Sequence, residues 1–537
     1  MKRRRVLAAI AVAVAVAAFV WSRDEAPVGA PASPPYVTIF MVDGLSRSVF
    51  AEELAAGNLP NVQRLIDDGV YVERGVSSFP SMTGYGFWPL QTGEDAVVSG
   101  VLGLRWLDRE RAQGNFRSYV GSTNVEMNLD LVAEPKTVFE RFGDAHSMTI
   151  NSYNNRGAVH SVKTGFKFTA AKYEGHWWVA DLLEAIPVFE EELSPTWEEV
   201  ERYAVDLLVA DLANGPKVQW VTFVSPDTYA HVNGLGPEYP GLVRMVDAMV
   251  GRYREAAAAR GVDDNRIYLF VSDHGVESLD RNVQLVDELG ARGVRAWRGE
   301  ATVLLSTGAL DTLQAFAEYD VVMAINGNLM SYLYVRSPSG WATAPTLQDM
   351  RSYDGKDLVA ELLEIEGIEH VIARDGADVR VFASDGVATI ATSSTGFSYR
   401  FEGEDPFGYA ADERAAPLVG GTFHDARAWI EATAESRYPY GTVRVARLMA
   451  QPGAGDLVVT SAPNYDLAKD YEMFVGNYRG GHGGLRADQI LVPYVIAGPG
   501  VPKARHFGTA AVEDVGATLL DALGEAPADV AGRSLVR

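Results

Sequence analysis

The chain contains no cysteine, and this absence excludes several kinds of chemistry. Without thiols the protein forms no disulfide bonds, no thiolate zinc site and no covalent intermediate on a cysteine. Positive charge is also scarce, because 47 lysines and arginines face 71 aspartates and glutamates, which gives a net charge of −24. Such a chain is a poor bulk partner for nucleic acid. An anionic substrate would need local positive charge, and bound metal cations are an economical source of it.

The composition is otherwise that of a large folded protein. Hydrophobic residues make up 47% and charged residues 22% of the 537 positions, as in ordinary globular proteins. This length predicts one large catalytic domain with a sizeable insertion, or two to three domains. There is no internal repeat in the sequence.

The N-terminus has the pattern of an export signal. Basic residues fill positions 2–5, and an apolar run of 16 residues extends from Val6 to Trp21. This length lies between a signal-peptide core and a membrane-spanning helix, so residues 1–21 are either a cleaved signal or an uncleaved membrane anchor. The basic start predicts that the body of the protein is exported, to the periplasm or the extracellular space. Residues 22–35 contain four prolines and are expected to form an extended linker.

Three apolar runs predict buried strands that lead into acidic residues. They are Tyr36 to Val42 before Asp43-Gly44, Val218 to Val224 before Ser225-Pro226-Asp227, and Ile267 to Val271 before Ser272-Asp273-His274. Continuous apolar runs of this kind are typical of parallel strands that are buried on both faces. A helical pattern over Tyr239 to Ala259 lies between the second and third runs. We therefore expect a doubly wound, mostly parallel α/β sheet flanked by helices, with these carboxylates at the carboxyl edge of its strands.

Further elements follow from the same patterns. Helices are expected at Pro60 to Gly69, Leu347 to Ile365 and Ala511 to Leu523, and strands at Val70 to Val76, Asp378 to Ser384, Val387 to Ser393, Phe397 to Phe401 and Ile490 to Ala497. The three short strands between 378 and 401 are separated by glycine-containing turns, as in a β-meander. These elements predict a catalytic core at 36–275 and 482–537, interrupted by an α+β insertion or cap at 276–481 that also contributes to the core.

The stretch from Phe79 to Gly93 is rich in glycine and proline and contains Thr83 ahead of a predicted helix. A hydroxyl at or near a helix N-terminus lies where unpaired backbone N–H groups favour negative charge. It can act as a nucleophile if its proton is removed, and a metal ion does this without a neighbouring base. The alternative interpretation of Thr83 is an ordinary helix cap.

Candidate ligands for such a metal lie elsewhere in the chain. They are carboxylates and imidazoles, the residue types suited to zinc and similar divalent ions. The candidates are Asp43, Asp227, His231, Asp273, His274 and His482. Each fragment alone has an ordinary explanation as a turn or loop. Four such fragments, in a chain with nine histidines, are difficult to attribute to chance.

Taken together, these fragments resemble the alkaline phosphatase superfamily, and within it the type I phosphodiesterase/nucleotide pyrophosphatase branch. The matching elements are Asp43-Gly44, the Phe-Pro-x-x-Thr loop that ends in Thr92-Gly93, Asp227-x-x-x-His231, Asp273-His274-Gly275 and His482-Gly483-Gly484. The resemblance extends from Tyr36 to about Leu523. It implies the alkaline phosphatase-like fold and the hydrolysis of small-molecule phosphate esters.

The resemblance also implies two divalent metal ions, for which zinc is the expected metal. Asp43, Thr83, Asp273 and His274 would hold one ion, and Asp227, His231 and His482 would hold the other. The first ion would activate Thr83 and the second would stabilise the leaving oxygen. Thr83 would form a phosphothreonine intermediate that water then cleaves. Ser81 is a rival nucleophile, but the family spacing of nine residues from the nucleophile to the threonine of Thr-Gly fits Thr83 and Thr92.

One position departs from the family pattern. Gly86 stands where an asparagine three residues after the nucleophile would contact a phosphoryl oxygen, and no Lys or Arg lies between Gly75 and Leu104. A phosphomonoester carries more negative charge than a diester and calls for more donors, so we expect diesters to be the favoured substrates. The neighbouring aromatic residues Tyr85, Phe87 and Trp88 would pack either against the second ester arm or in the core.

Three other functions compete with a phosphodiesterase. The first is a phosphomonoesterase, which would use the same residues. The second is a sulfatase, which needs a Cys/Ser-x-Pro-x-Arg sequence, whereas Ser78-Phe79-Pro80-Ser81-Met82 lacks the arginine. The third is a metal-free binding protein on the same fold, which would not need all seven ligand residues. The sequence carries no signal for the oligomeric state.

Overall fold

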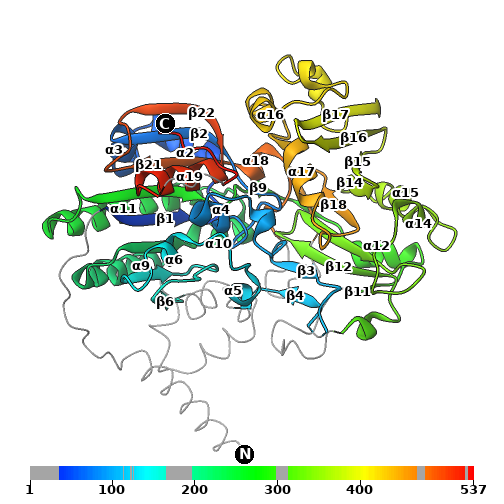
Figure 1. The fold of residues 1–537 in the computed structure, drawn as a ribbon, viewed down its shortest axis with the longest axis horizontal. Coiled ribbons are helices and arrows are strands. Elements are labelled where there is room, and N and C mark those ends of the chain that lie inside the picture. The colour runs from blue at the N-terminus through cyan, green and yellow to red at the C-terminus, as the bar shows by residue number, and fades with distance from the viewer. Residues whose placement is uncertain are drawn as a thin grey trace, which may run out of the picture.

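The computed structural model describes residues 35–112, 114–120, 124, 126–164, 196–297, 312–467, 478–525 and 530–536. The predicted signal or anchor at 1–21 and the linker up to residue 34 lie outside this part of the chain. Among the described helices, none is both long enough and apolar enough to cross a membrane. The chain forms two eight-stranded sheets, which lie side by side in Figure 1.

The first sheet has the strand order β22-β2-β21-β8-β1-β7-β5-β6. Its strands are β1 (Tyr36–Val42), β2 (Gly69–Val76), β5 (Ser147–Ile150), β6 (His160–Val162), β7 (Val218–Phe223), β8 (Arg266–Ser272), β21 (Leu491–Ala497) and β22 (Arg505–Ala511). Strand β1 lies between β7 and β8 and runs parallel to both. Strand β21 is antiparallel to its neighbours β2 and β8, whereas the other pairs in the sheet are parallel. The prediction of a mostly parallel sheet is therefore confirmed.

Helices cover both faces of this sheet. Along β1, Phe40 and Val42 join one buried cluster, while Ile39 and Met41 join another. The first cluster includes side chains of α2 (Arg47–Ala55), α3 (Pro60–Asp67), α9 (Trp197–Asp211) and α11 (Tyr239–Ala259), and the second those of α4 (Phe87–Thr92), α6 (Val138–Arg141) and α19 (Val512–Ala522). Burial on both faces explains why the sequence of β1 is apolar without alternation. The doubly wound α/β class is confirmed.

The second sheet has the order β11-β12-β13-β18-β14-β15-β16-β17 and is mostly antiparallel. Its strands are β11 (Ala296–Trp297), β12 (Val321–Asn326), β13 (Met330–Val335), β14 (Ile368–Asp375), β15 (Asp378–Phe382), β16 (Gly386–Ser393), β17 (Gly396–Gly403) and β18 (Leu457–Ser461). Strands β15 to β17 form the predicted meander. Helices α16 (Ala426–Thr433) and α17 (Gly441–Met449) share one buried cluster with this sheet, and α12 (Leu285–Ala291) shares another.

The single helix expected at Leu347 to Ile365 is wrong. The structure has two short helices instead, α14 (Leu347–Met350) and α15 (Leu358–Leu363). Between them, Asp354 and Gly355 have φ angles of 46° and 76°, a left-handed backbone that interrupts a right-handed helix. The Asp357 side chain then accepts hydrogen bonds from the N–H groups of Val359 and Ala360 in the first turn of α15. The Asp-Gly pair was the signal for this turn.

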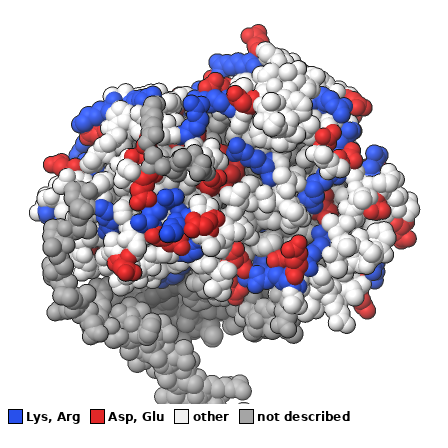
Figure 2. Space-filling view, in the orientation of Figure 1, with Lys and Arg blue, Asp and Glu red and all other residues white. Residues whose placement is uncertain are grey.

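Shorter elements lie between these strands and helices along the chain. They are η1 (Ala96–Val98), β3 (Arg105–Leu107), β4 (Phe116–Ser118), α5 (Met127–Asp130), η3 (Leu212–Asn214), α10 (Ser225–Asn233), β9 (Glu277–Ser278), β10 (Arg281–Asn282), η4 (Leu313–Phe316), η5 (Tyr409–Ala411), η6 (Ala416–Leu418), β19 (Tyr465–Asp466), β20 (Gly480–Gly481) and α18 (Ala487–Ile490). The pairing of β20 with β9 returns the chain to a point just beyond β8. Figure 2 shows acidic and basic side chains interspersed on the viewed face of the molecule.

Candidate active site

The predicted metal ligands meet at the carboxyl edge of the first sheet. Asp43 follows β1, Asp273 and His274 follow β8, and α10 carries Asp227 and His231 just after β7. Because β1 is parallel to both neighbours, these three strands end at the same edge, where α/β sheets bind ligands. The pairing of β20 with β9 then brings the following segment, which carries His482, to that edge.

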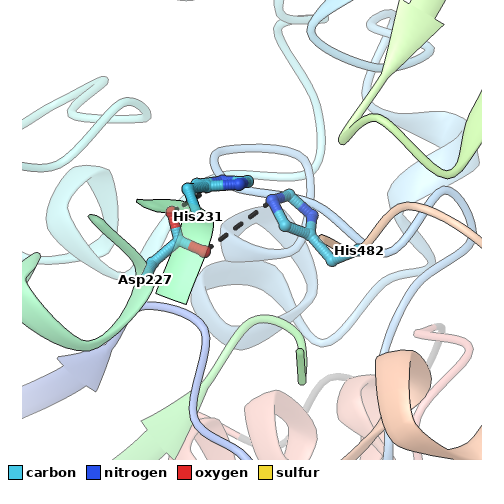
Figure 3. Close-up of side chains that lie close together, drawn as sticks. All are labelled: Asp227, His231 and His482. Atoms are coloured by element: carbon cyan, nitrogen blue, oxygen red, sulfur yellow. Dashed lines mark ion pairs between the residues drawn. The ribbon is translucent and has the colours of Figure 1, made fainter. Parts of the chain in front are cut away.

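The ligand atoms form two groups. Those of Asp43, Asp273 and His274 lie within 4.8 Å of one another, and so do those of Asp227, His231 and His482. In the second group, His231 Nε2 lies 3.2 Å and His482 Nε2 3.8 Å from the Asp227 carboxylate (Figure 3). The two groups adjoin, because the rings of His274 and His482 are stacked with their centroids 3.6 Å apart. The structure thus brings all six predicted ligand side chains together.

Thr83 lies against the first group. Its Oγ1 is 3.2 Å from Asp43 Oδ1 and 3.1 Å from His274 Nε2, and the residue is 6% exposed. The following helix, α4, begins only at Phe87, and its N-cap is Gly86. Thr83 is therefore near the helix N-terminus, as expected, but it is not a helix cap. The contacts of its hydroxyl are instead with two candidate ligands.

The three histidines present the same ring nitrogen to the centre. The Nδ1 atoms of His231, His274 and His482 lie 2.9–3.0 Å from the backbone carbonyls of Gly480, Gly275 and Ser81. A carbonyl accepts a hydrogen bond only from a protonated nitrogen, so these contacts place the proton on Nδ1 in the neutral ring. Nε2 is then left with a free lone pair, which is the arrangement of a histidine metal ligand.

Two buried carboxylate oxygens support the same interpretation. Among the described residues, Asp227 Oδ1 and Asp273 Oδ2 have no hydrogen-bond partner. Leaving a buried carboxylate oxygen without a hydrogen-bond donor is costly, and a cation removes that cost. The donor set of oxygen and imidazole nitrogen, without sulfur, also fits zinc or a similar divalent ion. The residues present therefore fit a metal centre.

The electrostatics of the site are dominated by crowded negative charge. Burial and the Asp227 charge raise the pKa of Asp43, and burial, with Asp43 and Asp227, raises the pKa of Asp273 well above its usual range. Burial lowers the pKa of His274, but Asp273 and Asp43 outweigh it and raise that pKa to about 10. Like charges this close disfavour ionisation. Asp227 differs, because burial raises its pKa but His231 and His482 lower it more, to below its usual range. A divalent cation at the centre would allow Asp43 and Asp273 to ionise beside it.

The pKa of His482, unlike that of His274, is lowered. Burial lowers it well below its usual range, and the neighbouring His274 lowers it further. The imidazole of His482 is therefore neutral at physiological pH. This is the protonation state that a metal ligand needs.

Two glycines permit the close approach of these groups. Gly44 has a φ of 61°, and a Cβ atom there would lie 2.6 Å from Asp227 Oδ1. Gly327 also has a φ of 61°, and its Cβ would lie 2.6 Å from His482 Nδ1. A side chain at either position would push a candidate ligand aside and strain the backbone.

The hydroxyl of Ser81, the rival nucleophile, is already engaged. Ser81 Oγ donates to the Gly484 carbonyl at 2.9 Å and accepts from the Gly483 N–H at 3.0 Å. These bonds tie the Thr83 loop to the segment after His482.

The departure at Gly86 has a steric explanation. A Cβ atom on Gly86 would lie 3.0 Å from Asp273 Cβ and 3.1 Å from the Asp273 carbonyl oxygen, so a side chain there would press on a candidate ligand. The aromatic residues beside it, Tyr85, Phe87 and Trp88, are all buried and belong to the core. Of the two roles that the sequence allowed for these rings, the structure supports core packing.

Sequence reasoning missed three residues near the site. Tyr153 follows β5, and its Cβ would be 2.9 Å from a Cβ on Gly84, the residue after Thr83. Lys163 follows β6; its Nζ lies 5.1 Å from the Tyr153 ring, and burial lowers its pKa to about 8. Glu201, fully buried on α9, accepts a hydrogen bond from the first N–H of α10 at 2.7 Å. Two signals in the sequence could have identified Tyr153 and Glu201. Tyr153 follows a short apolar run, and Glu201 is an acidic residue on the apolar face of a helix.

A doubly wound sheet with a hydroxyl, carboxylates and imidazoles at its carboxyl edge is the arrangement of hydrolases in the alkaline phosphatase superfamily. A family model described as type I phosphodiesterase / nucleotide pyrophosphatase matches residues 37–335, which is more than half of the chain. The chain belongs to the type I phosphodiesterase/nucleotide pyrophosphatase family. It is a phosphoester hydrolase that acts on small phosphate esters.

Solved structures of similar fold come from the same group of enzymes. Murine ectonucleotide pyrophosphatase/phosphodiesterase 5 matches with a TM-score of 0.52 and 12% identity, over 93% of this chain and 97% of that one. An inactive variant of the murine protein, in complex with AMP, gives 0.51 and 12%, and the human protein gives 0.52 and 11%, with the same coverage of both chains. At this identity the likeness shows the fold alone. No curated protein matches the chain significantly.

Proposed function

We propose that the protein is an exported two-metal phosphodiesterase that works through a phosphothreonine at Thr83. The observation that carries this proposal is the contact of Thr83 Oγ1 with Asp43 and His274, beside a second ligand group that stacks on the first. Export rests on the basic and apolar pattern of residues 1–21.

In this proposal, Asp43, Thr83, Asp273 and His274 would hold one divalent cation, and Asp227, His231 and His482 would hold the other. When bound, the cations lower the pKa of the Thr83 hydroxyl and neutralise charge on the phosphoryl group. Thr83 Oγ1 attacks phosphorus, and the bond from phosphorus to the alcohol oxygen breaks. Water then forms the new phosphorus–oxygen bond as the bond to Oγ1 breaks, which releases a phosphomonoester.

In the described part of the chain, the cationic side chains Arg486 and Lys163 are already engaged, which supports a diester as substrate. Arg486, the arginine that follows the His482 segment, is buried and paired with Glu277 and Glu369 at 2.7 and 2.8 Å. The Lys163 ammonium donates to the Ser152 carbonyl and faces the Tyr153 ring. The backbone N–H of Gly84, next to the nucleophile, is the proposed donor to a phosphoryl oxygen. A dianionic monoester would call for more donors than this.

The test is metal content and turnover in one series of samples. We expect protein stripped by a chelator to be inactive, and zinc to rebind at two ions per chain and restore hydrolysis of an aryl phosphodiester. The kcat/KM for this diester should exceed that for the matching aryl monoester. A monoester preference of about tenfold or more would instead assign a phosphomonoesterase. Protein that binds no metal and turns over neither ester would be a binding protein on this fold.

A further inference from the structure

A buried cluster of two arginines and two carboxylates lies where the segment that carries Thr83 begins and ends. We call Arg444, Arg447, Asp95 and Glu513 the arginine cluster. The arginines come from α17, Asp95 lies three residues after the end of α4, and Glu513 lies in the first turn of α19. The cluster therefore joins three distant parts of the chain.

The contacts within the arginine cluster are short, and they use the two terminal nitrogens of Arg444. Arg444 bonds Asp95 Oδ2 at 2.9 Å and Glu513 Oε2 at 2.8 Å, and Arg447 bonds the same two carboxylates at 2.7 and 2.8 Å. The Arg444 side chain is only 2% exposed. Two cations balance two anions, as a buried ionic group requires. A planar guanidinium fixes the direction of each bond, which a lysine ammonium does not.

Arg444 reaches both ends of the nucleophile segment, residues 77–94. Its Nη2 donates to the carbonyl of Val76, the last residue of β2, at 3.2 Å, while its Nη1 holds Asp95. One guanidinium thus bonds to the residues on either side of the segment.

The parts of the chain that carry or follow the candidate metal ligands contact the same segment separately. The Ser77 N–H donates to Ile490, Ser81 bonds to the segment after His482, and Gly86 lies against Asp273. Helix α17, in contrast, packs on strands β15 to β17 of the second sheet. The segment therefore lies between the ligand loops and a helix of the second sheet.

We propose that Arg444 is a positioning residue that sets the place of Thr83 relative to the metal ligands, and so couples the second sheet to turnover. This inference rests on the role of Thr83 proposed above. Misplacing a reacting group by about 1 Å can cost about 100-fold in rate, so a small shift of the segment is enough to reduce turnover.

The test compares Arg444→Lys with Arg109→Lys. Arg109 is a matched control because it makes a bidentate pair with buried Asp456, at 3.1 and 2.6 Å, and also donates to the Val335 carbonyl of the second sheet. Both variants keep the charge and lose the guanidinium fork, so both should lower the melting temperature. Only Arg444→Lys should lower kcat, by about 10–100-fold, with KM changed by less than about twofold. Zinc content should stay at the wild-type value in both.

A second readout does not depend on activity. Amide hydrogen exchange of residues 77–94 should become faster in Arg444→Lys and remain at the wild-type rate in Arg109→Lys. Should Arg444→Lys not fold, Arg447→Lys replaces it, with a smaller effect of the same sign because Arg447 shares the two carboxylates.

Two results would overturn the inference. One is a kcat and an amide exchange rate that remain at the wild-type values in Arg444→Lys, or in Arg447→Lys where that variant replaces it. The other is an equal loss of kcat in Arg109→Lys, which would mean general destabilisation. Inactive wild-type enzyme with the predicted exchange pattern would instead reject the role of Thr83 and leave the structural coupling standing.

Discussion

Gly86 shows how strongly a single backbone position can constrain the site. Because its absent Cβ would press on Asp273, the glycine lets a candidate ligand keep its place. An asparagine at this position, which the family pattern would suggest as a phosphoryl donor, would require Asp273 to shift by a few tenths of an ångström. The absence of a side-chain donor at Gly86 is therefore linked to the close packing of the candidate ligand Asp273.

We predict that Gly86→Asn weakens metal binding instead of improving catalysis. Displacing Asp273 should lower zinc affinity about 10–100-fold, the range seen when residues that orient metal ligands are changed. Competition with a chromogenic chelator measures this. Gly290→Asn is the control, because a Cβ on Gly290 meets nothing within 4 Å. A Gly86→Asn variant with intact zinc affinity and faster diester hydrolysis would contradict the steric account.

Residue type and strand ends predicted the place of three candidate ligands. Asp43, Asp227 and Asp273 each follow a long apolar run, and parallel strands bring such ends together. The orientation of the histidines could not be predicted, since it depends on carbonyls such as that of Gly480, 249 residues away from His231. Glu201 was missed because its partner, Ser225, lies on a different helix.

At the scale of elements, helix α19 carries a titratable group away from the candidate metal ligands. Asp514, in its first turn, accepts hydrogen bonds from the N–H groups of Ala511 and Arg533 at 3.0 and 2.8 Å. Burial and the neighbouring Glu513 raise its pKa to about 6. An acid with a raised pKa in the folded state binds more protons there than in the unfolded state between pH 3.8 and about 6.

Protonated Asp514 therefore stabilises the folded state at low pH. As pH rises from about 4 to about 6, the free energy of unfolding should decrease by about 2–3 kcal/mol because of this group. Asp514→Asn removes this titration, so the stability difference between wild type and variant should change across that window and become flat above it. Urea unfolding at several pH values measures the difference. A difference that does not vary with pH would show that burial does not raise this pKa.

Among elements, length decided what could be predicted. The 21-residue helix α11 and the seven-residue strand β1 match their expected bounds, because long periodic patterns carry a strong signal. Strands β5 and β6 have four and three residues and were not predicted. They are stabilised by pairing next to β7, a tertiary contact that no local pattern records.

At the scale of the molecule, the order of the segments matters most. His482 lies 208 residues after His274, yet their rings are stacked. The intervening chain contains the second sheet, and no local pattern in the sequence shows how the chain returns from it to the first sheet. The β9–β20 pairing supplies that path. The whole molecule also carries a net charge of −24, so bound cations are the natural source of affinity for an anionic ester.

The central claim is that Thr83 is the nucleophile of a metal-dependent phosphoester hydrolase. Thr83→Ala, Thr83→Ser and Ser81→Ala test it when zinc content and turnover of an aryl phosphodiester are measured together. The ligands Asp43, Asp273 and His274 remain in all three variants, so zinc content should be largely retained.

The decisive measurement is the turnover of Thr83→Ala, together with mass spectrometry of acid-quenched wild-type enzyme. We predict loss of nearly all turnover in Thr83→Ala, substantial activity in Thr83→Ser because its hydroxyl remains, and a phosphoryl group on the wild-type peptide at Thr83 that still carries the second ester arm of the substrate. Near wild-type turnover in Thr83→Ala, with an inactive Ser81→Ala, would contradict the account and assign the chemistry to Ser81.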